Sequence, residues 1–274
     1  MNRQNRNLQI ADYINVIFDT FMELHGDRKS GDDRTVIGGL ARLDGYKTIV
    51  IGYQSDKSTK IPRAPGPDGY RKCMRLIHLA EAFNKPVIVF IDIPAASSLP
   101  ASEQQRVNEV VARNLEEMSC LMTPIVGVLI GESSALMAID ICAADCVLIL
   151  EGASFPVSLL DETSASGAGG KAEEPESRKV GEVDIVPLHL KAQDLLNLGV
   201  AHRLVKESPS GDLKSVANAL REILSEEICR LTEVHTEVLV QQRLCRLRHQ
   251  SLNLGTELLS GNLSRIAESS FRKA

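Results

Sequence analysis

The sequence has 274 residues, of which 43% are hydrophobic and 24% charged, and its formal net charge is −5 at pH 7. These values fit a globular chain that buries a sizeable core, and the negative charge argues against general affinity for nucleic acid. No apolar run reaches the roughly eighteen residues of a membrane span, and the first residues lack a signal-peptide pattern, so we expect a cytoplasmic protein.

The first predicted element is an amphipathic helix over residues 9–25, followed by the polar loop HGDRKSGDDR. Two strand-like runs, TVIGGLARL and KTIVIGY, come next and flank Asp44-Gly45, a pair typical of a tight β-hairpin turn. The helix is predicted because apolar residues recur at the spacing of one helical face: Leu8, Ile14, Ile17, Phe18, Phe21 and Leu24.

Helices and strands alternate in the middle of the chain. We expect a helix over about residues 69–84, and then a strand in KPVIVFIDIP, whose continuous apolar run indicates burial on both faces. Ser102, with Gln105 three residues later, predicts a capping box at the start of the next helix. The runs TPIVGVLIGE and CVLILE are two further buried strands. This alternation is typical of a layered α/β domain.

The alternation ends at residues 161–182, a small, polar and charged segment that we interpret as a mobile loop. A short helix, a stop at Gly199 and a strand fit the following sequence HLKAQDLLNLGVAHRLV, and the C-terminal residues are predicted to be helical. None of the cysteines forms a C-x-x-C pair, so we expect buried free thiols: Cys73, Cys120, Cys142, Cys146, Cys229 and Cys245.

Several stretches are similar to the α subunit of the bacterial acetyl-CoA carboxylase carboxyltransferase. They include ELHGDRKSGDDRTVIGGLARLDG, GYRKCMRLIHLAEAFNKPVIVFID, PIVGVLIGE and DLLNLGV, and they follow the family's order from about residue 12 to 205. The resemblance implies an α/β fold of the crotonase type, a superhelix of ββα units with N- and C-terminal helices. We assign the N-terminal helix to 1–30, the carboxyltransferase-type domain to 31–207 and the C-terminal helical region to 208–274.

The resemblance also implies a reaction and a partner. In the family, a carboxyl group moves from carboxybiotin to acetyl-CoA, and backbone N–H groups in glycine-rich turns stabilise the oxyanions that form. A β-type subunit completes the active site in a heterodimer or heterotetramer and carries the zinc, so no metal or bound cofactor is expected on this chain. The substrate would be a thioester of CoA or phosphopantetheine, and an acyl or biotin carrier protein is a further candidate partner.

The sequence departs from the family at its glycine-rich turns. The family has T-P-G-A-Y-P-G after Asp92, where this chain has Ile93 to Leu99, including Ala95 and Ala96. It has G-G-S-G-G after Glu132, where this chain has Ser133, Ser134, Ala135, Leu136 and Met137. The candidate catalytic groups are therefore the backbone N–H groups of a degenerate oxyanion turn: Gly131, Ser133, Ser134 and Ala135. Either this turn still stabilises an anion, or side-chain packing has filled it.

A basic cluster lies around the proline-rich loop before residue 69. We expect it to contact the phosphates of the thioester carrier, although a solvated surface loop is the alternative. The candidate substrate-binding residues are Lys60, Arg63, Arg71 and Lys72, with Ala95 and Ala96. Glu132 is interpreted as a charge near a helix start rather than a general base, and the role of Asp140 stays open.

Three functions are compatible with these observations. The first is a carboxyltransferase α-like subunit with altered enolate chemistry, which transfers carboxyl groups or supports decarboxylation or condensation without biotin. The second is a non-catalytic scaffold that completes an αβ complex. The third is ordinary carboxylation of acetyl-CoA to malonyl-CoA, which the lost glycines oppose. We favour the first function, in which the chain is a subunit of an enzyme. The identity of the thioester and the use of biotin stay open.

Overall fold

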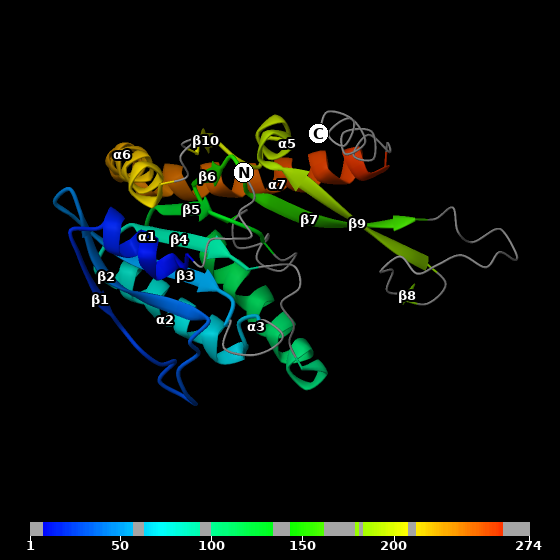
Figure 1. The fold of residues 1–274 in the computed structure, drawn as a ribbon, viewed down its shortest axis with the longest axis horizontal. Helices are drawn as coiled ribbons and strands as arrows, with labels where there is room; N and C mark the ends of the chain where they lie inside the picture. Colours follow the sequence, from blue (N-terminus) through cyan, green and yellow to red (C-terminus); the bar gives the residue numbers. More distant parts are fainter. Residues whose placement is uncertain are drawn as a thin grey trace, which may run out of the picture.

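The computed structural model describes residues 8–56, 63–93, 100–133, 143–161, 179–180, 183–207 and 212–259. Its centre is a seven-stranded sheet in the order β1-β2-β3-β4-β5-β6-β10 (Figure 1). β1, β2 and β3 pair antiparallel, whereas the strands from β3 to β10 pair parallel. These strands are β1 (Thr20–Glu23), β2 (Val36–Leu43), β3 (Tyr46–Gln54), β4 (Val87–Asp92), β5 (Ile125–Leu129), β6 (Cys146–Leu150) and β10 (Arg203–Val205).

A second, antiparallel sheet in the order β7-β9-β8 extends away from the central sheet (Figure 1). It is formed by β7 (Ser154–Asp161), β8 (Lys179–Val180) and β9 (Val183–Lys191). The described helices are α1 (Ile10–Ile17), α2 (Pro67–Ala82), α3 (Ala101–Ser119), α5 (Ala192–Asn197), α6 (Leu213–Thr232) and α7 (Thr236–Leu259).

The hairpin between β2 and β3 forms where the sequence predicts it. Leu43 pairs with Tyr46, and Asp44 and Gly45 form the turn with φ angles of 46° and 88°. Two successive positive φ angles match the right-handed twist of the flanking strands, and glycine adopts such an angle at little cost.

Helices cover both faces of the central sheet, with α1 and α6 on one side and α2 and α3 on the other (Figure 1). Two glycines in the β2–β3 ladder show how closely they pack. A Cβ atom on Gly38 would meet Leu76 of α2, whereas one on Gly52 would meet Ile10 of α1. The parallel strands β4, β5 and β6 are almost entirely buried between these layers, as their continuous apolar sequences predict.

The predicted helix over residues 9–25 is wrong beyond its first half. α1 ends at Ile17, Phe18 is extended, and the chain then forms the edge strand β1, in which Thr20 pairs with Arg42. The spacing of Phe21 and Leu24 suits a helix, but the backbone hydrogen bonds that this segment makes to β2 decide the outcome. The division of the chain at residues 30 and 207 stays a prediction.

Other local expectations also need correction. α3 begins after Pro100 and has no side-chain cap, so Ser102 lies inside the first turn and forms no capping box. Asp161 belongs to β7, and Lys179–Val180 form β8 at the end of the segment that the sequence suggests is a loop.

The described cysteines are free, but Cys120 and Cys245 are exposed, unlike the buried Cys73 and Cys146. Cys142 lies outside the described residues.

A buried arginine attaches α7 to the sheet. Arg243 is 1% exposed, and its Nε and Nη2 atoms donate to the two carboxylate oxygens of Asp145, just before β6, at 2.8 and 2.7 Å. Its remaining donors reach the carbonyls of Met118, Leu121 and Thr123, so every N–H of the guanidinium is used.

None of the helices in the described part of the chain combines the length and apolar character needed to cross a membrane.

Candidate functional site

The two turns that replace the family's glycine-rich turns follow adjacent parallel strands. The N–H of Ile93, just after β4, donates to the carbonyl of Glu132, just after β5, at 2.8 Å. The N–H of Ile130 donates to Ile91 at 3.0 Å and continues the ladder to the same edge. The carboxyl ends of parallel strands are where α/β folds place ligands, so this edge is the candidate site.

Gly131 is required at this edge because Asp92 lies against its backbone. A Cβ atom on Gly131 would overlap the Oδ1 atom of Asp92 and come within 2.7 Å of its Cγ atom. No larger residue fits here unless Asp92 moves. The structure thus gives a steric reason for the glycine that the sequence analysis proposes as part of an oxyanion turn, whereas the catalytic role of its N–H stays a proposal.

Ser133 is fully buried, and its backbone N–H donates to the carbonyl of Ser154 at 3.2 Å. The N–H of Ser154 in turn donates to the carbonyl of Gly131 at 3.0 Å, so two hydrogen bonds connect the start of β7 to the residues that follow β5. The fold therefore already uses the N–H of Ser133, which is one of the candidate donors to an anion. Ser134 and Ala135, the other candidate donors, lie outside the described residues, as do Ala95, Ala96 and Asp140.

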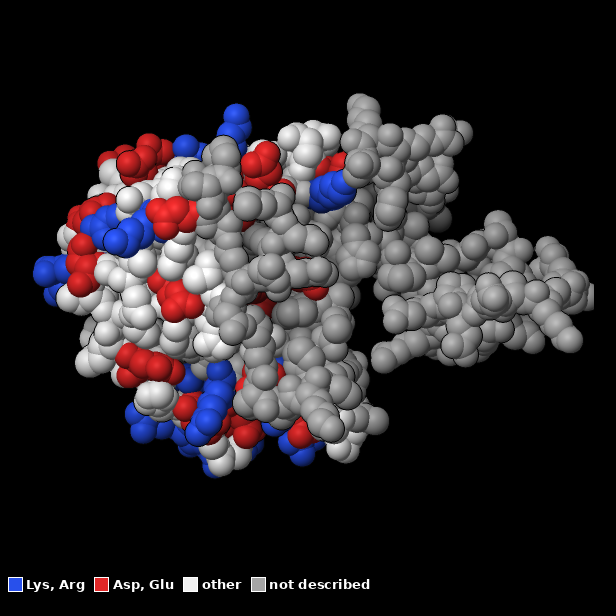
Figure 2. All heavy atoms as spheres, viewed as in Figure 1, with Lys and Arg blue, Asp and Glu red and all other residues white. Residues whose placement is uncertain are grey.

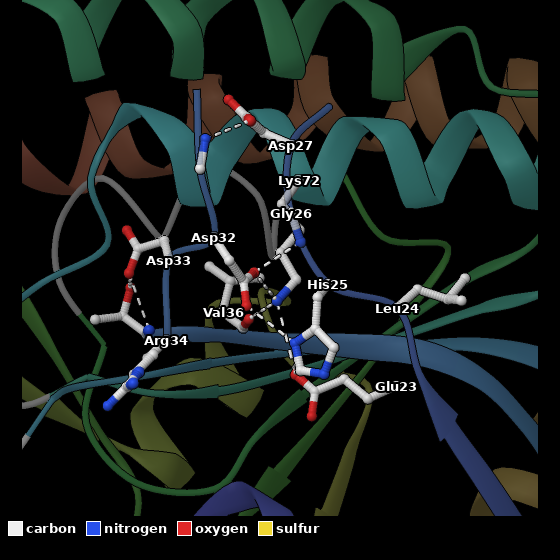
Figure 3. A network of polar contacts seen from close by, with 12 residues as sticks. Glu23, Leu24, His25, Gly26, Asp27, Asp32, Asp33, Arg34, Val36 and Lys72 are labelled. Atoms are coloured by element: carbon white, nitrogen blue, oxygen red, sulfur yellow. Dashed lines mark hydrogen bonds and ion pairs between the residues drawn. The ribbon is translucent and has the colours of Figure 1, made fainter. Parts of the chain in front are cut away.

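Lys72 of the predicted substrate-binding cluster is a buried structural cation. Its side chain is 1% exposed, and Nζ lies 2.7 Å from both Asp32 Oδ1 and the carbonyl of Val36 (Figure 3). Burial raises the pKa of Asp32, but hydrogen bonds from Lys72 and the Gly26 N–H outweigh it and lower the pKa to about 2. In this arrangement Lys72 has no surface to offer a phosphate.

Arg71 is similarly committed to the loop that precedes β2. Its Nε donates to Asp27 at 2.9 Å, and its Nη2 donates to Ser30 Oγ at 2.7 Å and to Asp68. The Asp27 carboxylate also accepts the N–H groups of residues 29–31, which together with Arg71 outweigh the effect of burial and hold its pKa well below the usual value. These contacts fix the loop against the start of α2.

Arg63 is the described member of the cluster that faces a pocket. It pairs with Glu103 at 3.0 Å but remains half exposed, whereas Lys60 lies outside the described residues. The pocket has a volume of about 350 Å³ and lies where the carboxyl end of β3 meets the starts of β2, α2 and α3. It therefore opens on the same edge of the sheet as the turns after β4 and β5.

Two arginines that the sequence pattern does not single out also line this pocket. Arg34 and Arg106 are exposed, and neither has an ion-pair partner within the described ranges. Arg34 belongs to the HGDRKSGDDR loop and Arg106 to the second turn of α3, so only the fold brings them beside Arg63. The five carboxylates around them are Asp32, Asp33, Asp56, Asp68 and Glu103.

Among the described residues on the face shown in Figure 2, basic and acidic side chains are interspersed and do not gather into one basic patch. Asp33 helps to fix the pocket wall. Its carboxylate accepts hydrogen bonds from the N–H of Thr35 at 3.0 Å and from the N–H of Gly66 at 2.8 Å, and so joins the start of β2 to the start of α2. Within the described residues, no group of three or more His, Cys, Asp and Glu side chains is arranged to hold a metal ion.

Solved structures of related fold support this architecture. One is a Pseudomonas malonate decarboxylase hetero-tetramer in complex with coenzyme A, with a TM-score of 0.58, 12% identity and coverage of 92% of this chain and 98% of that chain. Another is transcarboxylase 12S with hydrolysed methylmalonyl-coenzyme A bound, with a TM-score of 0.53, 14% identity and coverage of 80% and 41%, respectively. At such identities the likeness shows the fold, which is α/β and crotonase-like.

Sequence relatives are closer. The acetyl-coenzyme A carboxylase carboxyl transferase α subunit of Exiguobacterium sibiricum is 36% identical over 240 residues, which cover 85% of this chain and 75% of the relative. The subunit of the same name from Clostridium acetobutylicum is 36% identical over 245 residues, which cover 86% and 87%. Residues 1–251 also match the family model described as acetyl co-enzyme A carboxylase carboxyltransferase-like. The chain belongs to this carboxyltransferase α-subunit family.

Proposed function

We propose that this chain is the α-type half of a two-chain enzyme that transfers or removes a carboxyl group on an acyl thioester of CoA or of a carrier protein. The observation that carries the proposal is the joining of the two strand ends after β4 and β5 by the Ile93–Glu132 hydrogen bond. This contact brings the starts of both family-type turns to one edge, and we assign the stabilisation of nascent negative charge to backbone N–H groups of the second turn, whose residues 134 and 135 lie outside the described residues.

The chemistry requires a place for an enolate. When the bond between a carboxylate and the α-carbon of a malonyl thioester breaks, its electron pair moves onto the thioester oxygen and CO₂ leaves. A proton then adds to the α-carbon and completes decarboxylation. Transfer of CO₂ from a malonyl thioester to biotin forms the same enolate, and transfer of CO₂ from carboxybiotin to an acetyl thioester consumes it. One edge that stabilises this anion therefore serves both carboxyl transfer and decarboxylation.

The pocket lined by Arg34, Arg63 and Arg106 is our candidate for the phosphate end of the thioester carrier. It adjoins the edge that carries the turns, and two of its guanidiniums lack an ion-pair partner in the described structure. Arginine suits phosphate because its fork of donors matches the oxygen atoms of the anion. Lys72 and Arg71 support this wall through their bonds to Asp32 and Asp27 rather than by contacting the ligand.

A scaffold role is the second candidate, and one observation favours it. Ser133 is fully buried and its N–H is already bound to Ser154, so the start of the turn is packed as part of the fold. In that case a β-type subunit would provide all groups that touch the reacting atoms, and this chain would hold them in place.

The test is reconstitution of the full chain with a purified β-type subunit. Malonyl and acetyl thioesters, on CoA and on carrier protein, are offered with and without carboxybiotin, and CO₂ release and malonyl formation are measured. Turnover of either thioester that requires both chains supports the proposal. Malonyl formation only with carboxybiotin identifies ordinary carboxylation, and CO₂ release without it identifies biotin-independent decarboxylation. Equal turnover by the β-type subunit alone contradicts the proposal.

A further inference from the structure

An ion pair lies in the wall of the candidate pocket. It joins Arg63, in the loop before α2, to Glu103, in the first turn of α3. Nη2 of Arg63 donates to Oε2 of Glu103 at 3.0 Å. Both residues line the pocket, and their side chains are 46% and 27% exposed, respectively. A ligand that enters the pocket can therefore reach the pair.

Glu103 differs from two other carboxylates of the pocket lining in the partner that it holds. Asp32 pairs with Lys72, which lies outside the lining. Asp68 pairs with Arg71, which lies outside the lining as well. Glu103 instead pairs with an arginine of the lining itself, so it occupies a cation that the pocket could otherwise present to a ligand.

Two further arginines of the lining carry positive charge that is not committed to a carboxylate. Arg34 and Arg106 are exposed and have no ion-pair partner in the described part of the chain. They can attract an anion into the pocket as the fold stands. Arg63 becomes a third donor only when it leaves Glu103, so an anion that binds all three arginines must displace that carboxylate.

The contacts of the ion pair make this exchange inexpensive. The pair joins two partly exposed side chains, and such pairs contribute little to stability. A phosphate offers the guanidinium fork several oxygen acceptors and can take the place of the carboxylate. Gly66 leaves room beside the pair, because a Cβ atom there would lie 3.1 Å from Arg63 Nη2 and 3.2 Å from Glu103 Oε2.

We propose that Glu103 is an internal competitor, which occupies Arg63 in the free chain and releases it when the phosphate of a phosphopantetheine group enters the pocket. This inference rests on the proposed function, which assigns the pocket to the phosphate end of the thioester carrier. Glu103 then lowers the affinity for that carrier, because the ion pair has to break and like charges come close together. Removing its charge should tighten binding, whereas the loss of a merely supporting residue should weaken it.

The test measures binding of 4′-phosphopantetheine, and of pantetheine, which lacks the phosphate. Isothermal titration calorimetry is carried out on the full chain, alone and together with its β-type subunit. We expect Glu103→Gln to bind 4′-phosphopantetheine roughly fivefold more tightly than the wild type and to bind pantetheine equally well. CoA and a holo carrier protein, offered separately, show which of the two supplies the phosphopantetheine group.

Glu109→Gln is the matched control. It removes the same charge from an exposed position of α3 that does not line the pocket, so it should bind both compounds like the wild type. In an Arg63→Gln background, Glu103→Gln should tighten binding much less, because no guanidinium is left to compete for. Equal tightening in both backgrounds, or binding by Glu103→Gln that is unchanged or weaker, would overturn the proposal.

Two of the outcomes separate this inference from the proposed function. If Arg34→Gln and Arg106→Gln weaken binding of 4′-phosphopantetheine but Glu103→Gln does not tighten it, the competitor role is wrong and the assignment of the pocket stands. If none of the three variants changes binding, the pocket does not hold the phosphate, and both the assignment and the inference are wrong.

Discussion

Arg243 and Asp145 form a buried ion pair that connects α7 to the beginning of β6, with an Nη2–Oδ2 distance of 2.7 Å. Both side chains are almost inaccessible, and the remaining donors of Arg243 bind the carbonyls at the end of α3 and the start of β5. Such a pair costs desolvation energy, but removing one member leaves the other as an uncompensated buried charge. This pair is thus a sensitive point of the C-terminal region.

We predict that Arg243→Leu lowers the free energy of unfolding by about 3–5 kcal/mol, the cost of breaking a buried pair on one side. Urea denaturation followed by circular dichroism measures it. Arg248→Leu, on the exposed side of α7, should change stability by no more than about 0.5 kcal/mol. Similar losses of unfolding free energy in the two variants would show that the buried ion pair of Arg243 does not stabilise the C-terminal region.

Gly131→Ala should destabilise the protein by about 1–3 kcal/mol, because the new methyl group meets the carboxylate of Asp92. Combining it with Asp92→Ala removes the colliding atoms, so the cost of the alanine at 131 should fall in that background. A double-mutant cycle of unfolding free energies provides the measurement. An equal cost in both backgrounds would mean that Asp92 does not restrict this position.

The pair formed by Asp32 and Lys72 predicts a pH dependence. The folded-state pKa of Asp32 is lowered from 3.8 to about 2, so its contribution to stability is present above the unfolded pKa and is lost as pH falls through the folded pKa. The stability advantage of the wild type over Asp32→Asn should therefore shrink between about pH 4 and about pH 2. Urea unfolding at several pH values measures this, and Lys72→Met should weaken the trend. An advantage that does not vary with pH would contradict it.

Arg34→Gln and Arg106→Gln test the phosphate end of the proposed thioester site. Each should raise the KM for the thioester about tenfold with little effect on kcat, because a phosphate contact is equally strong in the ground and transition states. Arg113→Gln is the control, since Arg113 is exposed and pairs with Glu117 in its own helix. Steady-state kinetics with the reconstituted two-chain enzyme give the result. A KM that stays at the wild-type value in both variants would remove this pocket from the binding site.

The sequence predicts those elements in which the conformation that the local residues prefer is also the one that packs in the tertiary structure. Asp44-Gly45 supplies the turn that the β2–β3 hairpin needs, and the apolar runs of β4, β5 and β6 match strands that are buried on both faces. Residues 20–23 show the opposite case, because the apolar spacing around them fits a helix while pairing with β2 makes them a strand. That pairing joins residues far apart in the chain, so local periodicity does not contain it.

The candidate site is predictable only in part for the same reason. The resemblance identifies the turns after Asp92 and Glu132, and the fold places those strand ends side by side. Sequence alone does not show that Lys72 is buried against Asp32, nor that Arg34 and Arg106 share a pocket wall. A positive charge in a sequence is equally compatible with a ligand contact, an ion pair or a solvated surface, and only the surrounding structure distinguishes them.

The central claim is that backbone N–H groups of this chain stabilise the charge that forms on the thioester. It is tested most directly by turnover of the reconstituted enzyme carrying Ser134→Pro, which removes one N–H, against Ser134→Ala, which keeps it. We predict that kcat falls about 10²–10³-fold in the proline variant and little in the alanine variant, with assembly of both unchanged. Equal kcat values in the two variants would contradict the claim and assign the chemistry to the partner subunit.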